Sequence, residues 1–164
     1  MRILVIADTH IPSRAKRLPP TLLRALPRAD LILHAGDITA PEVLAELESH
    51  APVFAVAGNN DGPDLHQRLP LRTIVAAGGF RIGLVHGDGR GGTTYSRAAA
   101  AFTSGAVGCV VFGHSHQPLC RREKDVLYLN PGSPTDRRRQ PRFSFAWLTV
   151  GQDLYPELVY FESR

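Results

Sequence analysis

Cysteine is scarce in this chain, which has only Cys109 and Cys120 among 164 residues. Their positions match neither the C-x-x-C spacing of redox motifs nor the paired spacing of zinc ribbons. The sequence therefore offers no thiolate metal site of either kind. Cys109 lies in an apolar run, and we expect it to pack as a small hydrophobic residue.

Long hydrophobic runs are also missing, because no apolar stretch approaches the roughly 20 residues that a membrane-spanning helix needs. The N-terminus passes directly into a strand pattern instead of a basic and then apolar signal sequence. We therefore expect no membrane association and a cytoplasmic location. Neither repeats nor linkers divide the chain, and its length suits one domain over residues 1–164.

Positive charge is in modest excess, with 19 Lys and Arg against 15 Asp and Glu for a formal net charge of +4. It gathers in two clusters, Arg14 to Arg17 and Arg137 to Arg142. Charge runs of this kind are usually solvated. The alternative is that they extend recognition to charged substrates such as nucleotides or nucleic acid.

Polar side chains follow five apolar runs at the points where each run ends. The runs lie at residues 3–7, 31–33, 53–56, 82–85 and 110–112. Each is typical of a buried strand, and ligand sites in open α/β sheets gather at the carboxyl ends of strands. We therefore expect the polar residues that follow to converge on one crevice. They are Asp8, His10, Asp37, Asn59, His86, His114 and His116.

The order of the remaining elements predicts a mixed architecture. Helices are expected over residues 20–29 and 41–50, the second capped by Thr39, and an alanine-rich helix from Thr93 or Thr94 to Gly105. A hairpin over residues 73–86 and three late apolar segments without helices between them indicate antiparallel pairing. These segments lie at residues 126–129, 143–150 and 158–161. We expect two sheets packed face to face with helices outside, and exposed hairpin edges that could pair in a homodimer.

The residue types of the cluster indicate a pair of divalent metals. Asp8 and His10 are two residues apart, so an extended backbone would direct both side chains to one face, and His114 and His116 repeat this spacing. Gly113 lets the backbone turn closely beside the metal. A carboxylate can bridge two cations, whereas an imidazole cannot, so we choose Asp37 as the shared ligand.

The charge balance of such a centre favours an anionic substrate. Two carboxylates against two divalent cations leave two formal positive charges, and a water that bridges the metals could become the hydroxide nucleophile of an in-line displacement. Phosphoryl hydrolysis fits this arrangement. We expect manganese foremost, with iron, nickel or zinc as alternatives. His34, His50 and His66 are expected to be packed or surface residues, although His34 could support a ligand.

The ordered motifs resemble those of the calcineurin-like metallophosphoesterase superfamily. They are ADTH, HAGD, AGNND, VHGD and FGHSH, followed by the segment NPGS at residues 130–133, which resembles an element of the small single-domain phosphodiesterases. The resemblance implies a four-layer α/β/β/α sandwich of two mixed sheets flanked by helices, with a dinuclear metal site at the carboxyl edges.

The resemblance also assigns ligands and a reaction. One metal would be held by Asp8, His10, Asp37 and His116, and the other by Asp37, Asn59, His86 and His114. Asn60 occupies a position where many larger members carry histidine, and it cannot act as a general acid, so we expect it to help hold the nonbridging oxygens. The expected activity is phosphodiester hydrolysis. A phosphomonoesterase and a non-catalytic protein-binding scaffold, which the same superfamily includes, are the alternatives. Asn130 and Ser133 are expected to stabilise a nearby turn.

Overall fold

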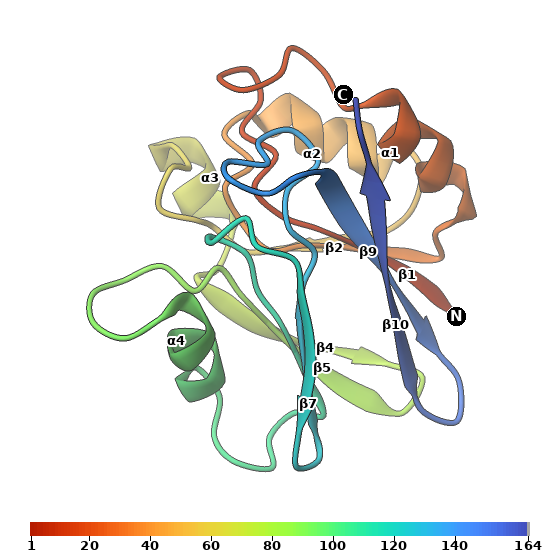
Figure 1. Ribbon diagram of the computed structural model, residues 1–164, viewed down its shortest axis with the longest axis vertical. Helices are drawn as coiled ribbons and strands as arrows, with labels where there is room; N and C mark the ends of the chain where they lie inside the picture. The colour runs from red at the N-terminus through yellow and green to blue at the C-terminus, as the bar shows by residue number, and fades with distance from the viewer. Residues whose placement is uncertain (164) are drawn as a thin grey trace.

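Two five-stranded sheets lie at the centre of the computed structural model, which describes residues 1–163 (Figure 1). The first sheet contains β1 (Arg2–Ile6), β2 (Leu31–His34), β3 (Val53–Ala55), β9 (Phe143–Val150) and β10 (Leu154–Phe161). The second contains β4 (Arg72–Ala77), β5 (Phe80–Val85), β6 (Cys109–Val111), β7 (Leu119–Glu123) and β8 (Val126–Asn130). Their orders are β10-β9-β1-β2-β3 and β4-β5-β6-β8-β7.

Both sheets mix parallel and antiparallel pairs. In the first sheet β1, β2 and β3 run parallel, while β9 pairs antiparallel with β1 and with β10. In the second sheet β5, β6 and β8 run parallel, and β4 and β7 are the antiparallel edges. The prediction of two mixed sheets is confirmed. The late segment that forms β8 pairs parallel with β6 and antiparallel with β7. The strand β7 is mostly exposed and was not predicted from the sequence.

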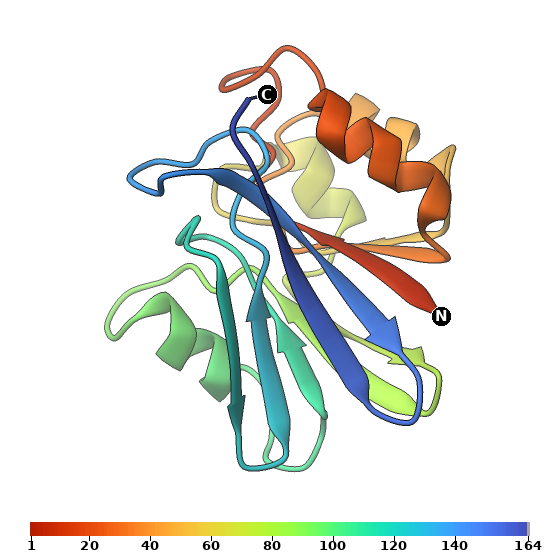
Figure 2. The ribbon, with the colours of Figure 1, turned by 45° about the vertical axis from the view of Figure 1, so that its right-hand side comes forward.

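Helices cover the outer faces of both sheets. The helices α1 (Pro20–Ala25), α2 (Pro41–Glu48) and α3 (Pro63–Arg68) lie on the first sheet, and α4 (Thr94–Ala100) lies on the second (Figure 2). The layer order is therefore α/β/β/α, as expected. The helix α3 was not predicted. None of the helices within residues 1–163 is long and apolar enough to cross a bilayer.

The strand β1 shows why its sequence is apolar at every position. Ile3 and Val5 face the core between the two sheets, whereas Leu4 and Ile6 face the core beneath the helices, and all four are fully buried. Burial of each such side chain contributes about 1.5–3 kcal/mol. A strand buried on both faces thus places the residue after it, Ala7, and the polar residues beyond at the junction of both layers.

Three helix boundaries differ from expectation. Thr39 does not cap α2, because Ala40 is the N-cap residue and the Thr39 hydroxyl donates to the carbonyl of Ile11 instead. Thr93 does cap α4 in a reciprocal capping box with Ser96, although this helix ends at Ala100 and not at Gly105. The first helix also ends early, where a 3-10 turn (Leu26–Arg28) begins.

The carboxyl ends of the two sheets come close together at Gly113, which follows Phe112 after β6. Its backbone N–H donates to the carbonyl of His86 at 3.1 Å. A Cβ atom at this position would lie 2.8 Å from Cβ of Ala7 and 2.9 Å from Oδ2 of Asp8. Residue 113 therefore has no room for a side chain, and this contact sets how near the loops of the two sheets come.

We predict that Gly113→Ala lowers the free energy of unfolding by about 1–3 kcal/mol, because the added methyl must displace Ala7 and Asp8. Urea denaturation of the metal-free protein measures this loss. Gly108→Ala is the matched control, since a Cβ there would meet only Cδ1 of Phe80 at 3.9 Å, an ordinary van der Waals contact. Equal stability of the two variants would contradict the close approach.

Candidate metal centre

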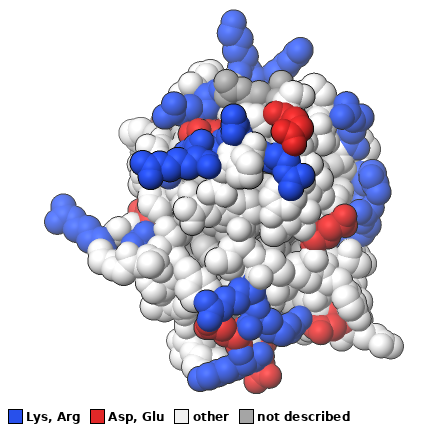
Figure 3. All heavy atoms as spheres, in the orientation of Figure 1, with Lys and Arg blue, Asp and Glu red and all other residues white. Residues whose placement is uncertain are grey.

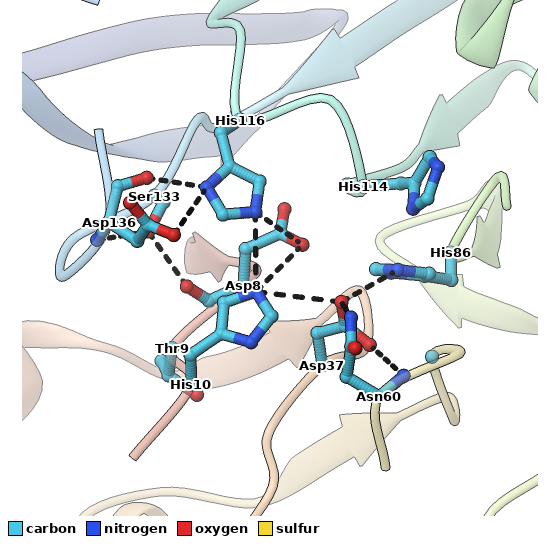
Figure 4. Close-up of polar contacts among 12 residues, drawn as sticks. Asp8, Thr9, His10, Asp37, Asn60, His86, His114, His116, Ser133 and Asp136 are labelled. Carbon is cyan, nitrogen blue, oxygen red and sulfur yellow. Dashed lines mark hydrogen bonds and ion pairs between the residues drawn. The ribbon is translucent and has the colours of Figure 1, made fainter. Parts of the chain in front are cut away.

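Six of the predicted ligands form two groups at the carboxyl ends of the strands (Figure 4). The first group is Asp8, His10 and His116, and the second is Asp37, His86 and His114. Within each group the ligand atoms all lie within 4.8 Å of one another. Every member is buried except His114, which is partly exposed. The loops that follow β1, β2, β5 and β6 thus meet at one place.

Asp37 lies between the two groups. Its Oδ2 atom is 3.5 Å from Nε2 of His10 and 3.3 Å from Nε2 of His86. Within the first group, Nε2 of His10 lies 3.2 Å from Nε2 of His116. One carboxylate oxygen therefore faces ring nitrogens that come from both sheets, which is the position that a bridging ligand requires.

Several buried polar atoms of these groups lack a hydrogen-bond partner among the described residues. They are both carboxylate oxygens of Asp8, Nε2 of His86 and Nδ1 of His114. A buried polar group left without a partner costs about 1–3 kcal/mol, and more when it is charged. Divalent cations bound by nitrogen and oxygen donors would satisfy these atoms, so the residues present fit such a metal pair.

The backbone of the ligand loops is turned and not extended. Asp8, His10, Asp37, His114 and His116 all have φ between 43° and 64°, in the left-handed region. The expectation that extended backbone would align Asp8 with His10 is therefore wrong. The side chains converge because each loop reverses sharply after its strand. Non-glycine residues in this region cost of order 1–3 kcal/mol each and persist only where their surroundings hold them.

Hydrogen bonds to the backbone orient two of the histidine rings. Nδ1 of His86 lies 2.7 Å from the carbonyl oxygen of Ala35. Nδ1 of His116 contacts the carbonyl oxygen of Asp136 in the same way. A ring nitrogen that donates to a carbonyl leaves the opposite nitrogen as an acceptor for a metal. Both rings therefore direct Nε2 toward the centre.

Asp61 supports the loop that carries Asp37. Its carboxylate accepts backbone N–H donors from Ile38 and Thr39 at 2.7 Å, from Gly58 at 2.8 Å and from Asp37 at 3.1 Å. Asp61 is the last residue of the AGNND motif, but no role was predicted for it from the sequence. The available sequence signal was an aspartate three residues after Gly58, a spacing at which its side chain can accept backbone N–H donors of the turn.

The segment after β8 ties the first ligand loop to the second sheet. The Ser133 hydroxyl donates to the carbonyl of Asp8 at 2.7 Å, and the Thr135 hydroxyl donates to the carbonyl of Thr9 at 2.6 Å. Asn130 contacts the carbonyl of Gly113 through its amide at 2.8 Å. The expected turn-stabilising role of Asn130 and Ser133 agrees with these contacts, whereas Thr135 was missed because nothing local marks it.

We predict that Thr135→Val loosens this attachment. Valine keeps the shape of threonine but leaves a buried carbonyl without its donor, so the free energy of unfolding should fall by about 1–3 kcal/mol. Thr103→Val, at an exposed threonine, is the control. Urea denaturation of both variants measures the difference. A Thr135→Val protein with unchanged free energy of unfolding would show that the hydrogen bond to Thr9 contributes nothing to stability.

The charges of the second group are strongly coupled. Burial alone would raise the pKa of Asp37, but the His86 ring and two N–H donors of Asn60 hold it well below its usual range. Burial would also lower the pKa of His86, but the Asp37 and Asp8 carboxylates raise it to about 9. Burial lowers the pKa values of His10 and His114, which keeps their rings neutral and able to act as ligands.

The two asparagines of the AGNND motif differ in their surroundings. The backbone N–H of Asn60 donates to Oδ1 of Asp37 at 2.8 Å, and its side-chain amide donates to Oδ2 at 2.7 Å. Asn59 is exposed. The structure therefore places Asn60 directly beside Asp37, while the role of Asn59 as a metal ligand stays a prediction.

The other histidines lie outside the two groups. His50 and His66 are exposed, as expected. His34 is fully buried, and its Nε2 lies 3.1 Å from the hydroxyl of Thr9, the residue between Asp8 and His10. His34 therefore supports the first ligand loop without joining it.

We predict that His34 makes stability depend on pH. Burial lowers its pKa from 6.5 to about 4, so between these values the unfolded chain binds a proton that the folded chain does not. The free energy of unfolding should therefore fall as the pH drops from about 6.5 toward 4, by up to about 3 kcal/mol for a shift of this size. Urea titrations of the metal-free protein should show a shallower fall for His34→Gln. Parallel curves would reject the assignment.

Comparisons with known proteins identify relatives along most of the chain. The sequence profile of the calcineurin-like phosphoesterase superfamily domain matches residues 1–153. A probable metallophosphoesterase from Methanothermobacter thermautotrophicus is 43% identical over 163 residues, which are 97% of this chain and 92% of that protein. A phosphodiesterase from Methanocaldococcus jannaschii is 27% identical over 80% of this chain and 83% of its own length.

The fold is also similar to that of Vps29. The crystal structure of wild-type Vps29 from Entamoeba histolytica in complex with Zn²⁺ has a TM-score of 0.76 and 25% sequence identity. The similarity covers 98% of this chain and 99% of that one. The two-sheet arrangement is therefore shared with a protein that was solved with a bound divalent metal.

Proposed function

The chain belongs to the calcineurin-like phosphoesterase superfamily, and on that basis we propose that it is a metal-dependent phosphodiesterase with two metals in one centre. The observation that carries this proposal is the position of Asp37. Its Oδ2 atom faces His10 on one side and His86 on the other, beside buried donor atoms that have no hydrogen-bond partner among the described residues. The similarity to a phosphodiesterase supports the choice of reaction.

The ligand assignment follows the two groups. One metal would be held by Asp8, His10, Asp37 and His116, and the other by Asp37, Asn59, His86 and His114. The absence of thiolates and the mixture of imidazole, carboxylate and amide donors suit manganese, iron, nickel or zinc. When bound, such a pair supplies Lewis acidity and a water of lowered pKa.

The protein's own charges prepare the centre for a phosphate group. Two buried carboxylates, Asp8 and Asp37, offset only half of the charge of two divalent cations, so an anionic substrate is favoured. His10 and His114 remain neutral because burial lowers their pKa values. These two imidazoles thus offer uncharged nitrogen donors to a cation.

Asn60 would act on the substrate as a hydrogen-bond donor. Its side-chain amide lies at the Asp37 carboxylate and borders an open cavity that also reaches His10. From this position it can donate to a nonbridging oxygen of the phosphate, but an amide cannot protonate a leaving group. The proposal therefore favours diesters whose leaving groups need little help from an acid.

We predict that Asp37→Ala removes bound metal and activity together, because this residue serves both metals. Hydrolysis of bis(p-nitrophenyl) phosphate with added Mn²⁺ should fall by more than about 100-fold. Elemental analysis of the purified variant should show a matching loss of metal. Asp125→Ala, at an exposed carboxylate in the turn between β7 and β8, is the control. Manganese-stimulated activity that survives in Asp37→Ala would reject the assignment.

A protein-binding scaffold is the alternative that the similarity to Vps29 raises. Metal titration coupled to a panel of phosphate mono- and diesters separates the possibilities. Turnover of diesters supports the proposal, and a clear preference for monoesters would make the protein a phosphomonoesterase. Metal binding without any turnover would favour the scaffold.

A further inference from the structure

We infer that the cavity beside His10 binds a second phosphate group of the substrate, chiefly through Arg138. This inference rests on the proposed phosphodiesterase function and names the class of its substrate. The scissile phosphate would lie at the two ligand groups, and the second phosphate would lie on the first-group side of the centre.

The cavity adjoins both ligand groups. It has a volume of about 460 Å³ and is open to solvent along the loops that follow β1 and β8. His10 of the first group and Asn60, which contacts Asp37 of the second, both line it. Its outer wall is formed by Arg14 and Arg138. A substrate held at the metals would therefore extend into a space lined by two guanidinium groups.

Arg138 carries the positive charge of this cavity that no neighbouring carboxylate offsets. Asp136 also lines the wall, but its Oδ2 lies 3.3 Å from Nε of Arg14, so these two charges largely offset each other. The Arg138 side chain donates one bond, to the carbonyl of His114 at 3.2 Å, and it has no carboxylate partner within residues 1–163. A guanidinium has five N–H donors, so most of those on Arg138 remain for a ligand.

The other polar groups of the wall cannot replace it as donors. The hydroxyl of Ser13 donates to the carbonyl of His10, and the hydroxyl of Thr39 donates to the carbonyl of Ile11. Their hydrogens are therefore already engaged. Apart from Asn60 and His10, which lie at the metal-binding groups, the guanidinium groups are the donors that the cavity offers to an anion, and their planar fork matches a phosphate in two-point contact.

Positive charge continues beyond this cavity. A neighbouring cavity of about 420 Å³ shares residues 12–14 with it and is also lined by Lys16 and Arg17. Figure 3 shows Lys and Arg side chains gathered over the upper part of the molecule, where Figure 1 places the loop after β1 and the connection from β8 to β9. A chain of phosphates leaving the metals would thus meet cationic groups in succession.

The substrate class that fits is a phosphodiester that bears at least one more phosphate. Two sources supply this chemistry. In an oligonucleotide the second phosphate is the next one along the backbone. In a dinucleoside polyphosphate an anhydride bond joins it to the scissile phosphate, which carries two substituents as a diester does. Both would place an anion within the same cavity, and the experiment must separate them.

The test compares Arg138→Met with Arg139→Met, a change at an exposed neighbour that does not line the cavity. Dinucleoside monophosphates with and without a 5′-phosphate form one arm, and a dinucleoside diphosphate against bis(p-nitrophenyl) phosphate forms the other. In each arm, the preference is the ratio of kcat/KM for the doubly phosphorylated compound to kcat/KM for the singly phosphorylated one. In the arm that represents the natural substrate, this ratio should fall about tenfold in Arg138→Met, mainly because KM rises. The salt dependence of kcat/KM should become shallower, and Arg139→Met should retain the preference.

Equilibrium binding keeps the inference testable apart from turnover. Fluorescence anisotropy with a labelled dinucleotide, with and without the 5′-phosphate, should show that the 5′-phosphate strengthens binding to the wild-type protein but not to Arg138→Met, if the oligonucleotide is the source. Isothermal titration calorimetry measures the affinity for the dinucleoside diphosphate, which should be weaker in Arg138→Met than in the wild-type protein if that compound represents the source. The role of Arg138 would be overturned if Arg138→Met lost equal affinity for the singly and the doubly phosphorylated compounds. It would also be overturned if Arg138→Met lost affinity in neither arm. Absence of turnover by the wild-type protein would instead reject the proposed activity, while these binding data still decide the role of the cavity.

Discussion

The rest of the site depends on the contact of the buried Asp37 carboxylate with His86 and Asn60. The carboxylate is fully removed from solvent, and an isolated charge in such a place costs several kcal/mol. The His86 ring from the second sheet and the amide groups of Asn60 offset this cost. The second ligand group therefore depends on contact between residues of both sheets.

The ligand loops show how a strained arrangement is maintained. Five of the proposed ligands adopt left-handed backbone, which an isolated loop would not retain. Asp61 holds the loop after β2 through three backbone N–H groups and the loop after β3 through that of Gly58. Ser133 and Thr135 hold the loop after β1 through two carbonyls. Side chains that bind no metal thus fix the geometry of those that would.

The same fold occurs in phosphoesterases and in Vps29, so architecture alone does not decide between catalysis and protein binding. The decision lies in the site. Here the buried donor atoms of both groups face one another, and an open cavity with two arginines adjoins them. Buried donor atoms without a hydrogen-bond partner lower stability unless a cation binds them, so these groups favour a metal site, and the proposed activity rests on that site.

Hydrophobic periodicity in the sequence was sufficient to locate most of the strands and the polar residues that follow them. This succeeded because β1 and β2 are buried on both faces, which requires unbroken apolar runs that end abruptly at the metal edge. The predicted two-sheet sandwich followed from the same pattern. The short α3 and the exposed β7 were missed because neither has a continuous apolar face.

Local pattern alone determined which residues could serve as ligands, and the tertiary structure decided how they are used. Three contacts join positions that are far apart in the chain. Asn60 contacts Asp37, Thr135 contacts the loop after β1, and Arg138 contacts the loop after β6. Backbone turns, not the two-residue spacing, bring Asp8 and His10 together. The physical reason is that periodicity records which face of an element is buried, whereas the meeting of two loops depends on how whole sheets pack.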